Sequence, residues 1–356
     1  MKGLILATVA LLAAISGFMV FRGISSTQRF SHVEITRYNQ WRSKFNRLYA
    51  TPSEGQFRMD VVINKIRMVD SWNQEYEEFL SNNDLTSVTE PMFVSMPWDD
   101  LTTEEFKKAK TGLNPELRVG DEIESGLGYE LKQQKSEGLG QAKPYEHKIR
   151  NQGECGSCWA FSTIATLEKQ YYNSKKVQID LSHQELVDCS DQDSGCDGGW
   201  PTNTYSYIQN NGIQNAATYP YYGNQYYCDR DESKRIWFDS SFAAKEIAFT
   251  TTSALNAANN GIVAGTCVHS ALKFNNLGAS PDIYNAAASG ECAKQVDHAV
   301  NIQSSGKDEK GAVYIVIQNS WGTEWGTGGV KKIYPCGSSK VWGSPSIISY
   351  TQNIRL

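Results

Sequence analysis

The stretch that decides the fold is Gln152-Gly153-Glu154-Cys155-Gly156-Ser157-Cys158-Trp159-Ala160-Phe161. Cys158 falls at the start of a helix that we expect over 157–172, where free backbone N–H groups and the helix dipole favour a thiolate. The thiolate is the attacking form of a cysteine, and Gly153 and Gly156 let the backbone turn tightly ahead of it. A bare Cys-x-x-Cys would also suit a metal, but the chain has no second Cys/His pair at zinc-ligand spacing. The stretch therefore predicts a nucleophilic Cys158 and no metal or other cofactor.

Two later segments complete the pattern. They are Val296-Asp297-His298-Ala299-Val300 and Gln318-Asn319-Ser320-Trp321-Gly322-Thr323-Glu324-Trp325-Gly326. Together with residues 152–161, and in the same order along the chain, they closely resemble the active-site segments of the papain and cathepsin family of cysteine proteases. Three separate segments in the right order make a coincidence very improbable.

The resemblance implies a role for each matching residue. His298 would take the proton of Cys158 and later give it to the leaving amine. Asn319 would hold the His298 ring through its amide oxygen, and Trp321 would shield that hydrogen bond from water. The side chain of Gln152 and the backbone N–H of Cys158 would bind the oxyanion. Among the other histidines, we expect His183 on the surface in a first helical turn, and His269 in or beside a strand.

The resemblance extends to the substrate-binding surface. Gly198 and Gly199 would pair with the backbone of an extended peptide, and glycine permits that close approach. An apolar pocket for the residue two before the scissile bond would be lined by Trp200, Pro201, Val296 and Ala299, with Trp321 also at the binding surface. We expect a bulky hydrophobic residue there. No insertion typical of exopeptidases stands between Cys189 and Cys228, so endopeptidase activity is the expectation.

The eight cysteines all follow residue 150. By the resemblance, Cys155 pairs with Cys196 and Cys189 with Cys228. The family's third bridge joins Cys292 to a cysteine near the C-terminus, but Trp342 stands where that cysteine belongs. Either a Cys292–Cys336 bridge forms by local rearrangement, or Cys267 takes one of the two. Since Cys158 must stay free, a second thiol is left over.

The first part of the chain predicts helices. Thr51-Pro52-Ser53-Glu54 is a helix start with a capping box, apolar residues then recur at helical spacing, and Glu54 and Arg58 stand one turn apart. A shorter helix is expected to begin near Thr102. The residues that resemble the cathepsin L-like propeptide motif are Glu54, Arg58, Val62, Lys65, Val69 and Asn73, followed by Trp98-Asp99-Asp100-Leu101-Thr102. Such a propeptide lies through the cleft in reverse and blocks it.

The domain organisation follows from these segments. Lys2 and an apolar run over 4–20, followed by small and polar residues, predict a cleaved signal peptide at 1–25, with an uncleaved anchor as the alternative. An inhibitory propeptide is expected over 28–115, a linker and processing region over 116–133, and the peptidase domain over 134–356. Protein or peptide substrates and the chain's own propeptide are the expected partners. We expect a monomer in the lysosome, vacuole or extracellular space, without nucleic-acid or stable membrane binding.

The order of the predicted helices and strands, together with the resemblance, predicts the fold class and the function. Helix candidates over 157–172 and 182–187, followed by strand candidates over 299–302, 313–317 and 347–350, indicate an α+β fold. The resemblance implies the papain-like form, with a helical lobe, a β-barrel-like lobe and the active-site cleft between them. The predicted function is a propeptide-inhibited cysteine endopeptidase. The alternative is a catalytically inactive binding or inhibitory protein on the same scaffold.

Overall fold

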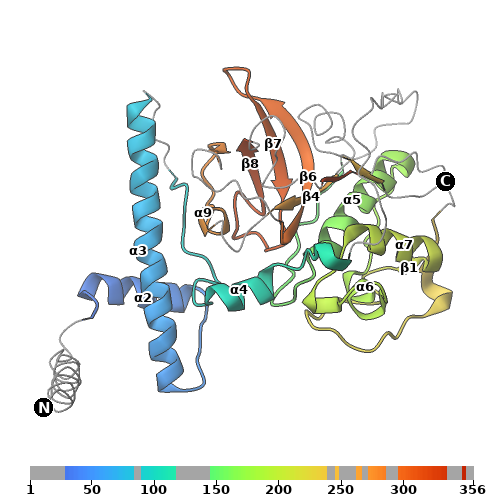
Figure 1. Cartoon of the computed structure of the whole chain (residues 1–356), viewed down its shortest axis with the longest axis horizontal. Helices are drawn as coiled ribbons and strands as arrows, with labels where there is room; N and C mark the ends of the chain where they lie inside the picture. The colour runs from blue at the N-terminus through green and yellow to red at the C-terminus, as the bar shows by residue number, and fades with distance from the viewer. Residues whose placement is uncertain are drawn as a thin grey trace, which may run out of the picture. The chain divides into compact units, whose positions relative to one another are not determined.

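The computed structural model describes residues 29–83, 90–117, 145–238, 245–247, 262–266, 272–285, 296–334 and 347–349 (Figure 1). The predicted signal peptide, most of the predicted linker, His269 and the cysteines 267, 292 and 336 lie outside these residues. None of the described helices has an apolar stretch long enough for a bilayer. The chain forms two compact units, Met1–Ile66 and Arg67–Leu356.

The first unit holds α2 (His32–Lys44) and the start of α3 (Pro52–Asn82). Helix α3 begins where the sequence predicts, because the Glu54 N–H donates to Thr51 Oγ1 at 3.2 Å. The predicted pair also forms, with Arg58 Nε 3.9 Å from Glu54 Oε1. One buried cluster holds this unit together, and its members are Phe30, Tyr38, Trp41, Val62, Ile63 and Ile66.

The second unit continues with the rest of α3 and then α4 (Thr103–Lys110), followed by the short helix η1 (Pro115–Leu117). The predicted start near Thr102 is confirmed: Thr102 and Glu105 form a capping box at the head of α4. Lysines in the last turn of α4 suit the negative end of the helix dipole.

Three helices form one half of the rest of this unit, α5 (Cys158–Lys175), α6 (His183–Cys189) and α7 (Pro201–Asn211). Helix α7 was not expected from the sequence, since its only start signal is Pro201 at its first position. Short elements connect them: η2 (Gly195–Asp197), η3 (Glu232–Lys234), and an antiparallel pair of β1 (Ile213–Gln214) and β2 (Arg235–Ile236). Disulfides join Cys155 to Cys196 and Cys189 to Cys228.

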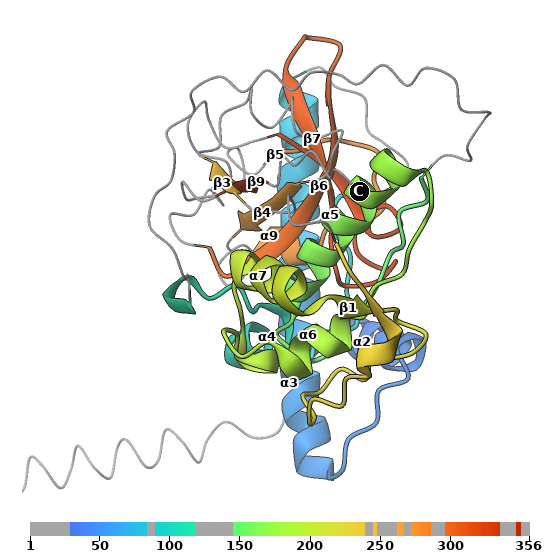
Figure 2. The same ribbon diagram turned by 90° about the vertical axis from the view of Figure 1, so that its right-hand side faces the viewer.

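The other half is a seven-stranded sheet (Figure 2). Its order is β3 (Lys245–Ile247), β9 (Ile347–Ser349), β4 (Ile262–Thr266), β6 (His298–Lys307), β7 (Val313–Gln318), β8 (Val330–Tyr334) and β5 (Tyr284–Asn285). All neighbours are antiparallel except β5 and β8. The short helix α9 (Leu272–Asn275) precedes β5. Asn301 on β6 donates to Thr166 on α5 at 2.6 Å, so helices and sheet meet at α5 and β6. The predicted α+β class with two lobes is confirmed.

Candidate active site

Cys158 is the first residue of α5 and is fully buried. The turn ahead of it is tight, since the Gly156 N–H donates to the Cys196 carbonyl at 2.9 Å. A Cβ on Gly156 would lie only 2.4 Å from that oxygen, which explains the glycine. The thiol sulfur accepts the backbone N–H of Ala299, at 3.3 Å, from strand β6. The helix start therefore places the sulfur at the junction of α5 and β6.

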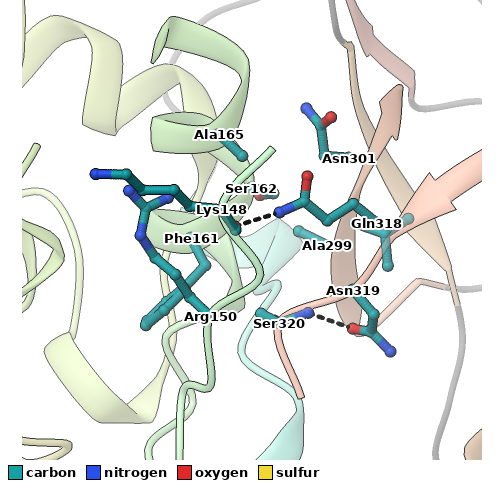
Figure 3. A pocket seen from close by; sticks show the side chains of 11 residues that line it. Lys148, Arg150, Phe161, Ser162, Ala165, Ala299, Asn301, Gln318, Asn319 and Ser320 are labelled. Atoms are coloured by element: carbon teal, nitrogen blue, oxygen red, sulfur yellow. Dashed lines mark hydrogen bonds between the residues drawn. The ribbon is translucent and has the colours of Figure 1, made fainter. Parts of the chain in front are cut away.

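His298 begins β6 and lies beside Asn319, which follows β7. His298 Nε2 is 2.8 Å from Asn319 Oδ1, and the Ser320 N–H donates to the same oxygen at 2.8 Å (Figure 3). The Trp321 ring covers this bond, with its centroid 4.7 Å from that of the imidazole. Because Asn319 Oδ1 only accepts, Nε2 carries the hydrogen and Nδ1 is the basic nitrogen. Nδ1 is buried and has no hydrogen-bond partner among the described residues.

Gln152 is held at both ends of its side-chain amide. Its Oε1 accepts the Ser320 hydroxyl at 2.6 Å, and its Nε2 donates to the Cys155 carbonyl at 2.9 Å. Its backbone is fixed too: the N–H donates to the Ser320 carbonyl and the C=O accepts the Tyr221 hydroxyl, both at 2.8 Å. The amide orientation is thus determined, and one of the two N–H groups of Nε2 has no hydrogen-bond partner among the described residues.

Residues 111–114 cover this site. The Gly199 N–H donates to the Gly112 carbonyl at 2.8 Å, and the Asn114 N–H donates to the Gly199 carbonyl at 3.1 Å. These bonds make a parallel bridge between Leu113 and Gly199. Gly112 and Leu113 both donate to the Asp297 carbonyl at 3.0 Å. We call Gly198 and Gly199 the glycine strand. The segment before η1 therefore runs along the glycine strand as an added strand.

Leu113 fills an apolar site beside that strand. Its side chain is 5% exposed. It belongs to the same buried cluster as Trp200, Val296 and Ala299. Pro201, the fourth residue expected in the pocket, is buried at the start of α7. Three of the four residues expected around the apolar pocket thus share one buried cluster with Leu113, and Pro201 is not a member of that cluster.

Burial dominates the electrostatics of the covered site. It raises the pKa of the Cys158 thiol to about 12 and lowers the pKa of His298 to about 4. Each shift disfavours the charged form, because a covered, low-dielectric site cannot hydrate an ion. The thiol of Cys158 and the imidazole of His298 are therefore both neutral while residues 111–114 are in place.

Asp193 organises the glycine strand, and the sequence analysis missed it. Its Oδ1 accepts the Trp200 N–H at 2.8 Å, and its Oδ2 accepts the Ser190 hydroxyl at 2.6 Å. A Cβ on Gly199 would lie 2.7 Å from Oδ1 and 2.5 Å from the Trp159 ring, so only glycine fits. Burial raises the pKa of Asp193 to about 6. An aspartate in a run of aspartates and serines gave no signal of this role.

One sequence interpretation is wrong. His183, expected on the surface, is 3% exposed and its ring lies 4.2 Å from that of Phe161. The cap at Ser182 is present as predicted, since the Glu185 N–H donates to its Oγ at 2.9 Å. That first turn, however, faces α5 instead of solvent. Burial accordingly lowers the pKa of His183 well below its usual value.

A pocket lies behind the site, on the α5 side of Asn319 and Ser320 (Figure 3). Lys148, Arg150 and Gln318 line it, together with apolar atoms of Phe161 and Ala165. The Gln318 amide donates to the Lys148 carbonyl across it at 2.8 Å. Arg150 is directed to Glu168 and Asp180, at 2.8 and 2.6 Å. This pocket lies at the junction of the two lobes, and Cys158 is not among the residues that line it.

Comparison with known proteins gives consistent matches. A model of the papain family of cysteine proteases matches residues 141–341. Chymopapain from Carica papaya is 29% identical over 84% of this chain and 80% of the relative. Human cathepsin L2 is 28% identical over 87% and 90%. In fold, the chain resembles digestive procathepsin L 3 of Tenebrio molitor larval midgut, with TM-score 0.70, 20% identity, and coverage of 90% and 100%. A recombinant stem bromelain precursor gives TM-score 0.68, 22% identity, and coverage of 89% and 98%.

Proposed function

Since the chain belongs to the papain family of cysteine proteases and is a cysteine endopeptidase, we propose that Cys158 is its nucleophile and that its own N-terminal segment keeps it latent. The observation that carries the assignment is the hydrogen bond between His298 Nε2 and Asn319 Oδ1. That bond leaves the basic Nδ1 buried and without a hydrogen-bond partner among the described residues. A buried nitrogen without a partner is costly, and it is accounted for if a proton donor comes to it during the reaction.

The reaction proceeds through an acyl-enzyme. His298 Nδ1 takes the proton from Cys158, and the thiolate adds to the carbonyl carbon of the scissile bond. The oxyanion accepts hydrogen bonds from Gln152 Nε2 and the Cys158 N–H. The C–N bond then breaks, the leaving amine takes the proton from the imidazolium, and a thioester remains on Cys158. Water, deprotonated by His298, hydrolyses the thioester, which releases the acid and restores the thiol.

Leu113 supports the proposed substrate preference. In the covered site this side chain packs with Trp200, Val296 and Ala299 next to Gly199. A peptide that pairs with the glycine strand would place the side chain two before the scissile bond in the same apolar space. We therefore assign this pocket to bulky hydrophobic residues, with Gly198 and Gly199 binding the peptide backbone and Trp321 flanking it.

The covering segment supports the proposed latency. It pairs with Gly199 in the parallel sense, whereas the resemblance implies that substrate runs the opposite way. A reversed chain presents its peptide bonds to the sulfur in an orientation unsuited to attack, so it blocks without being cut. We assign 28–115 as propeptide, 116–133 as the processing region and 134–356 as peptidase. A cleaved signal at 1–25, secretion or lysosomal delivery, and a monomeric mature enzyme complete the proposal.

Hydrolysis by the matured enzyme tests this function. Fluorogenic peptides that differ only at the residue two before the scissile bond (Leu, Phe or Arg) are compared under reducing, mildly acidic conditions. We expect kcat/KM to be at least about 10-fold higher for Leu and Phe than for Arg, because the pocket cannot hydrate a guanidinium. Cys158→Ala is the control and should be inactive on all three. Equal inactivity of wild type and Cys158→Ala would instead indicate an inactive scaffold, and a preference for Arg would overturn the pocket assignment.

A further inference from the structure

A second strand is added to the peptidase, separate from the one at Gly199. Residues 92–94, between α3 and α4, lie along residues 276–278, which follow α9 (Figure 1). The Val94 N–H donates to the Asn276 carbonyl and the Gly278 N–H donates to the Met92 carbonyl, both at 2.8 Å. Phe93 and Leu277 form the antiparallel bridge between these bonds. We call Asn276, Leu277 and Gly278 the 276–278 edge.

Side chains fix the register of this added strand. The Asn276 amide donates to the Val94 carbonyl at 3.0 Å and to Asp99 Oδ1 at 2.9 Å. Phe93 is 3% exposed and its ring meets the Tyr284 ring edge-on, with centroids 6.1 Å apart. The edge therefore binds a backbone strand and one large apolar side chain at its centre.

The edge is held from inside by residues of the peptidase itself. Lys331 Nζ on β8 donates to the Ser280 carbonyl at 2.6 Å and to the Gly278 carbonyl at 3.3 Å. The Gly326 N–H donates to the Leu277 carbonyl at 2.8 Å. Lys331 is only 2% exposed, so its ammonium depends on these two carbonyls. None of these bonds involves residues 92–94, so all three would remain available to hold the edge when that strand leaves.

Removal of the propeptide would uncover this surface. The carbonyl of Asn276 and the N–H of Gly278 would lose the partners supplied by residues 92–94, as an open sheet edge. Leu277 and Tyr284, at most 1% exposed here, would lose the cover of Phe93. An unpaired edge beside exposed apolar side chains is the arrangement that binds extended peptides by strand addition.

We propose that the mature peptidase keeps the 276–278 edge as a second peptide-binding site, which takes an extended segment with a large apolar side chain at its centre. The site is distinct from the catalytic cleft, and it would hold a protein substrate at a second point. This inference rests on the proposed removal of the propeptide. The partner class follows from the present occupant, Met92-Phe93-Val94, whose backbone and central ring make the contacts.

Gly278 offers a selective variant. A Cβ on Gly278 would lie 2.8 Å from Val94 Cγ1, 3.0 Å from the Pro91 carbonyl oxygen and 3.4 Å from Val94 Cγ2. These three nearest atoms all belong to the added strand and the residue before it. Gly278→Ala should therefore fit the free enzyme and obstruct the bound strand. Gly311→Ala is the control for a glycine-to-alanine change away from the edge: nothing lies within 4 Å of its Cβ position, and its φ of +81° makes it the more strained substitution of the two.

The experiment uses matured enzyme whose Cys158 has been titrated and blocked by an irreversible peptidyl inhibitor. Fluorescence anisotropy then follows a labelled peptide of residues 90–96. We expect saturable binding, weakened at least about 10-fold by Gly278→Ala or by Phe93→Ser in the peptide, and unchanged by Gly311→Ala. Absent binding to fully titrated enzyme, or equal binding by Gly278→Ala, overturns the proposal. A chain that titrates no active cysteine contradicts the proposed function instead, so the two failures are distinguishable.

Lys331 gives a second variant. Lys331→Met should weaken peptide binding at the edge, because it removes the donor that holds Gly278 and Ser280. Turnover of a short peptide substrate by the same variant should stay within about 2-fold of wild type, which shows that the fold is intact. Full peptide binding by a folded Lys331→Met variant would contradict the claim that the edge is preformed.

Discussion

Ser320 and Gln152 show how much of the site depends on contacts between side chains. The Ser320 hydroxyl donates to Gln152 Oε1 at 2.6 Å, and Gln152 is completely buried. This bond prevents the amide from exchanging its oxygen and nitrogen, and thereby fixes the N–H groups that we propose as oxyanion donors.

Ser320→Ala tests this positioning role. We expect kcat to fall by about 3- to 10-fold with little change in KM, because the amide loses its fixed orientation while substrate binding is untouched. Gln152→Ala should cost more, about 10²-fold in kcat, since it removes the donor itself. Steady-state kinetics of both variants on one peptide substrate measure these two losses in kcat. A rise in KM alone for Ser320→Ala would show that the serine acts on substrate binding instead.

Asp193 predicts a pH dependence of stability. Its folded pKa, about 6, lies above the ordinary 3.8, so folding favours the protonated carboxyl. This contribution is fully present below about pH 4 and is lost as the pH rises to about 6. Asp193→Asn keeps the acceptor oxygen without the charge. Its free energy of unfolding, relative to wild type, should therefore rise by about 2–3 kcal/mol between pH 4 and pH 7. Denaturant titrations at both pH values, with Cys158 blocked, measure this; a constant difference would contradict it.

At the residue scale, the sequence singled out the residues that we propose as catalytic and missed those that hold them in place. Cys158, His298, Asn319 and Gln152 all stand in local motifs. Ser320, Asp193 and Tyr221 act through contacts with residues far away in the chain, and no local pattern identifies them. His183 was placed wrongly for the same reason, since a capping box predicts a helix start and not which way its first turn faces.

At Gly112, the segment 111–114 lies very close to the turn ahead of Cys158. This residue has φ of +146°, and a Cβ on it would lie 1.9 Å from the Gly156 carbonyl oxygen. No side chain fits between the segment and the turn ahead of Cys158.

Gly112→Ala should therefore weaken the propeptide without affecting the mature enzyme. We expect the unprocessed precursor to gain peptidase activity at neutral pH, at least about 10-fold above wild type. Gly311→Ala is the control, because it also replaces a glycine of positive φ but has open space around it. Equal latency of the two variants in a precursor assay would show that residues 111–114 do not control access to Cys158.

Helix α5 is joined to the segment 145–150, which precedes the active site, by a buried ion pair. Arg150 donates to Glu168 Oε1 at 2.8 Å, and the Arg150 carbonyl accepts the Gly322 N–H at 3.0 Å. Glu168 is 2% exposed, and burial raises its pKa to about 7 despite the arginine. A buried carboxylate that loses its partner is strongly destabilising.

Arg150→Met should lower the free energy of unfolding by about 2–4 kcal/mol at pH 7. The loss should be smaller at pH 5, because the unpaired Glu168 can then bind a proton. Adding Glu168→Gln to Arg150→Met should recover part of the loss, which a double-mutant cycle measures. Additive effects of the two substitutions would show that the pair does not couple α5 to this segment.

For the whole molecule, the order of helices and strands was enough to predict an α+β fold. The motif resemblance then supplied the two-lobed form that the comparisons support. Helix α7 escaped prediction because two of its buried positions carry the polar residues Asn203 and Thr204, which weakens the apolar pattern. The added strands at Gly199 and at the 276–278 edge could not be located either, since they pair segments far apart in the chain.

The central claim is that Cys158 is the nucleophile of an endopeptidase whose site is closed by its own propeptide. Burial in the covered form holds the Cys158 pKa at about 12, which leaves almost no thiolate at neutral pH. The most direct test is the rate of alkylation of Cys158 by iodoacetamide at pH 6, located by peptide mass mapping, in the precursor and after maturation. We predict an adduct on Cys158 at least about 100-fold faster after maturation, with peptidase activity lost in proportion. Equal rates in the two forms, or full activity with Cys158 alkylated, would contradict the account.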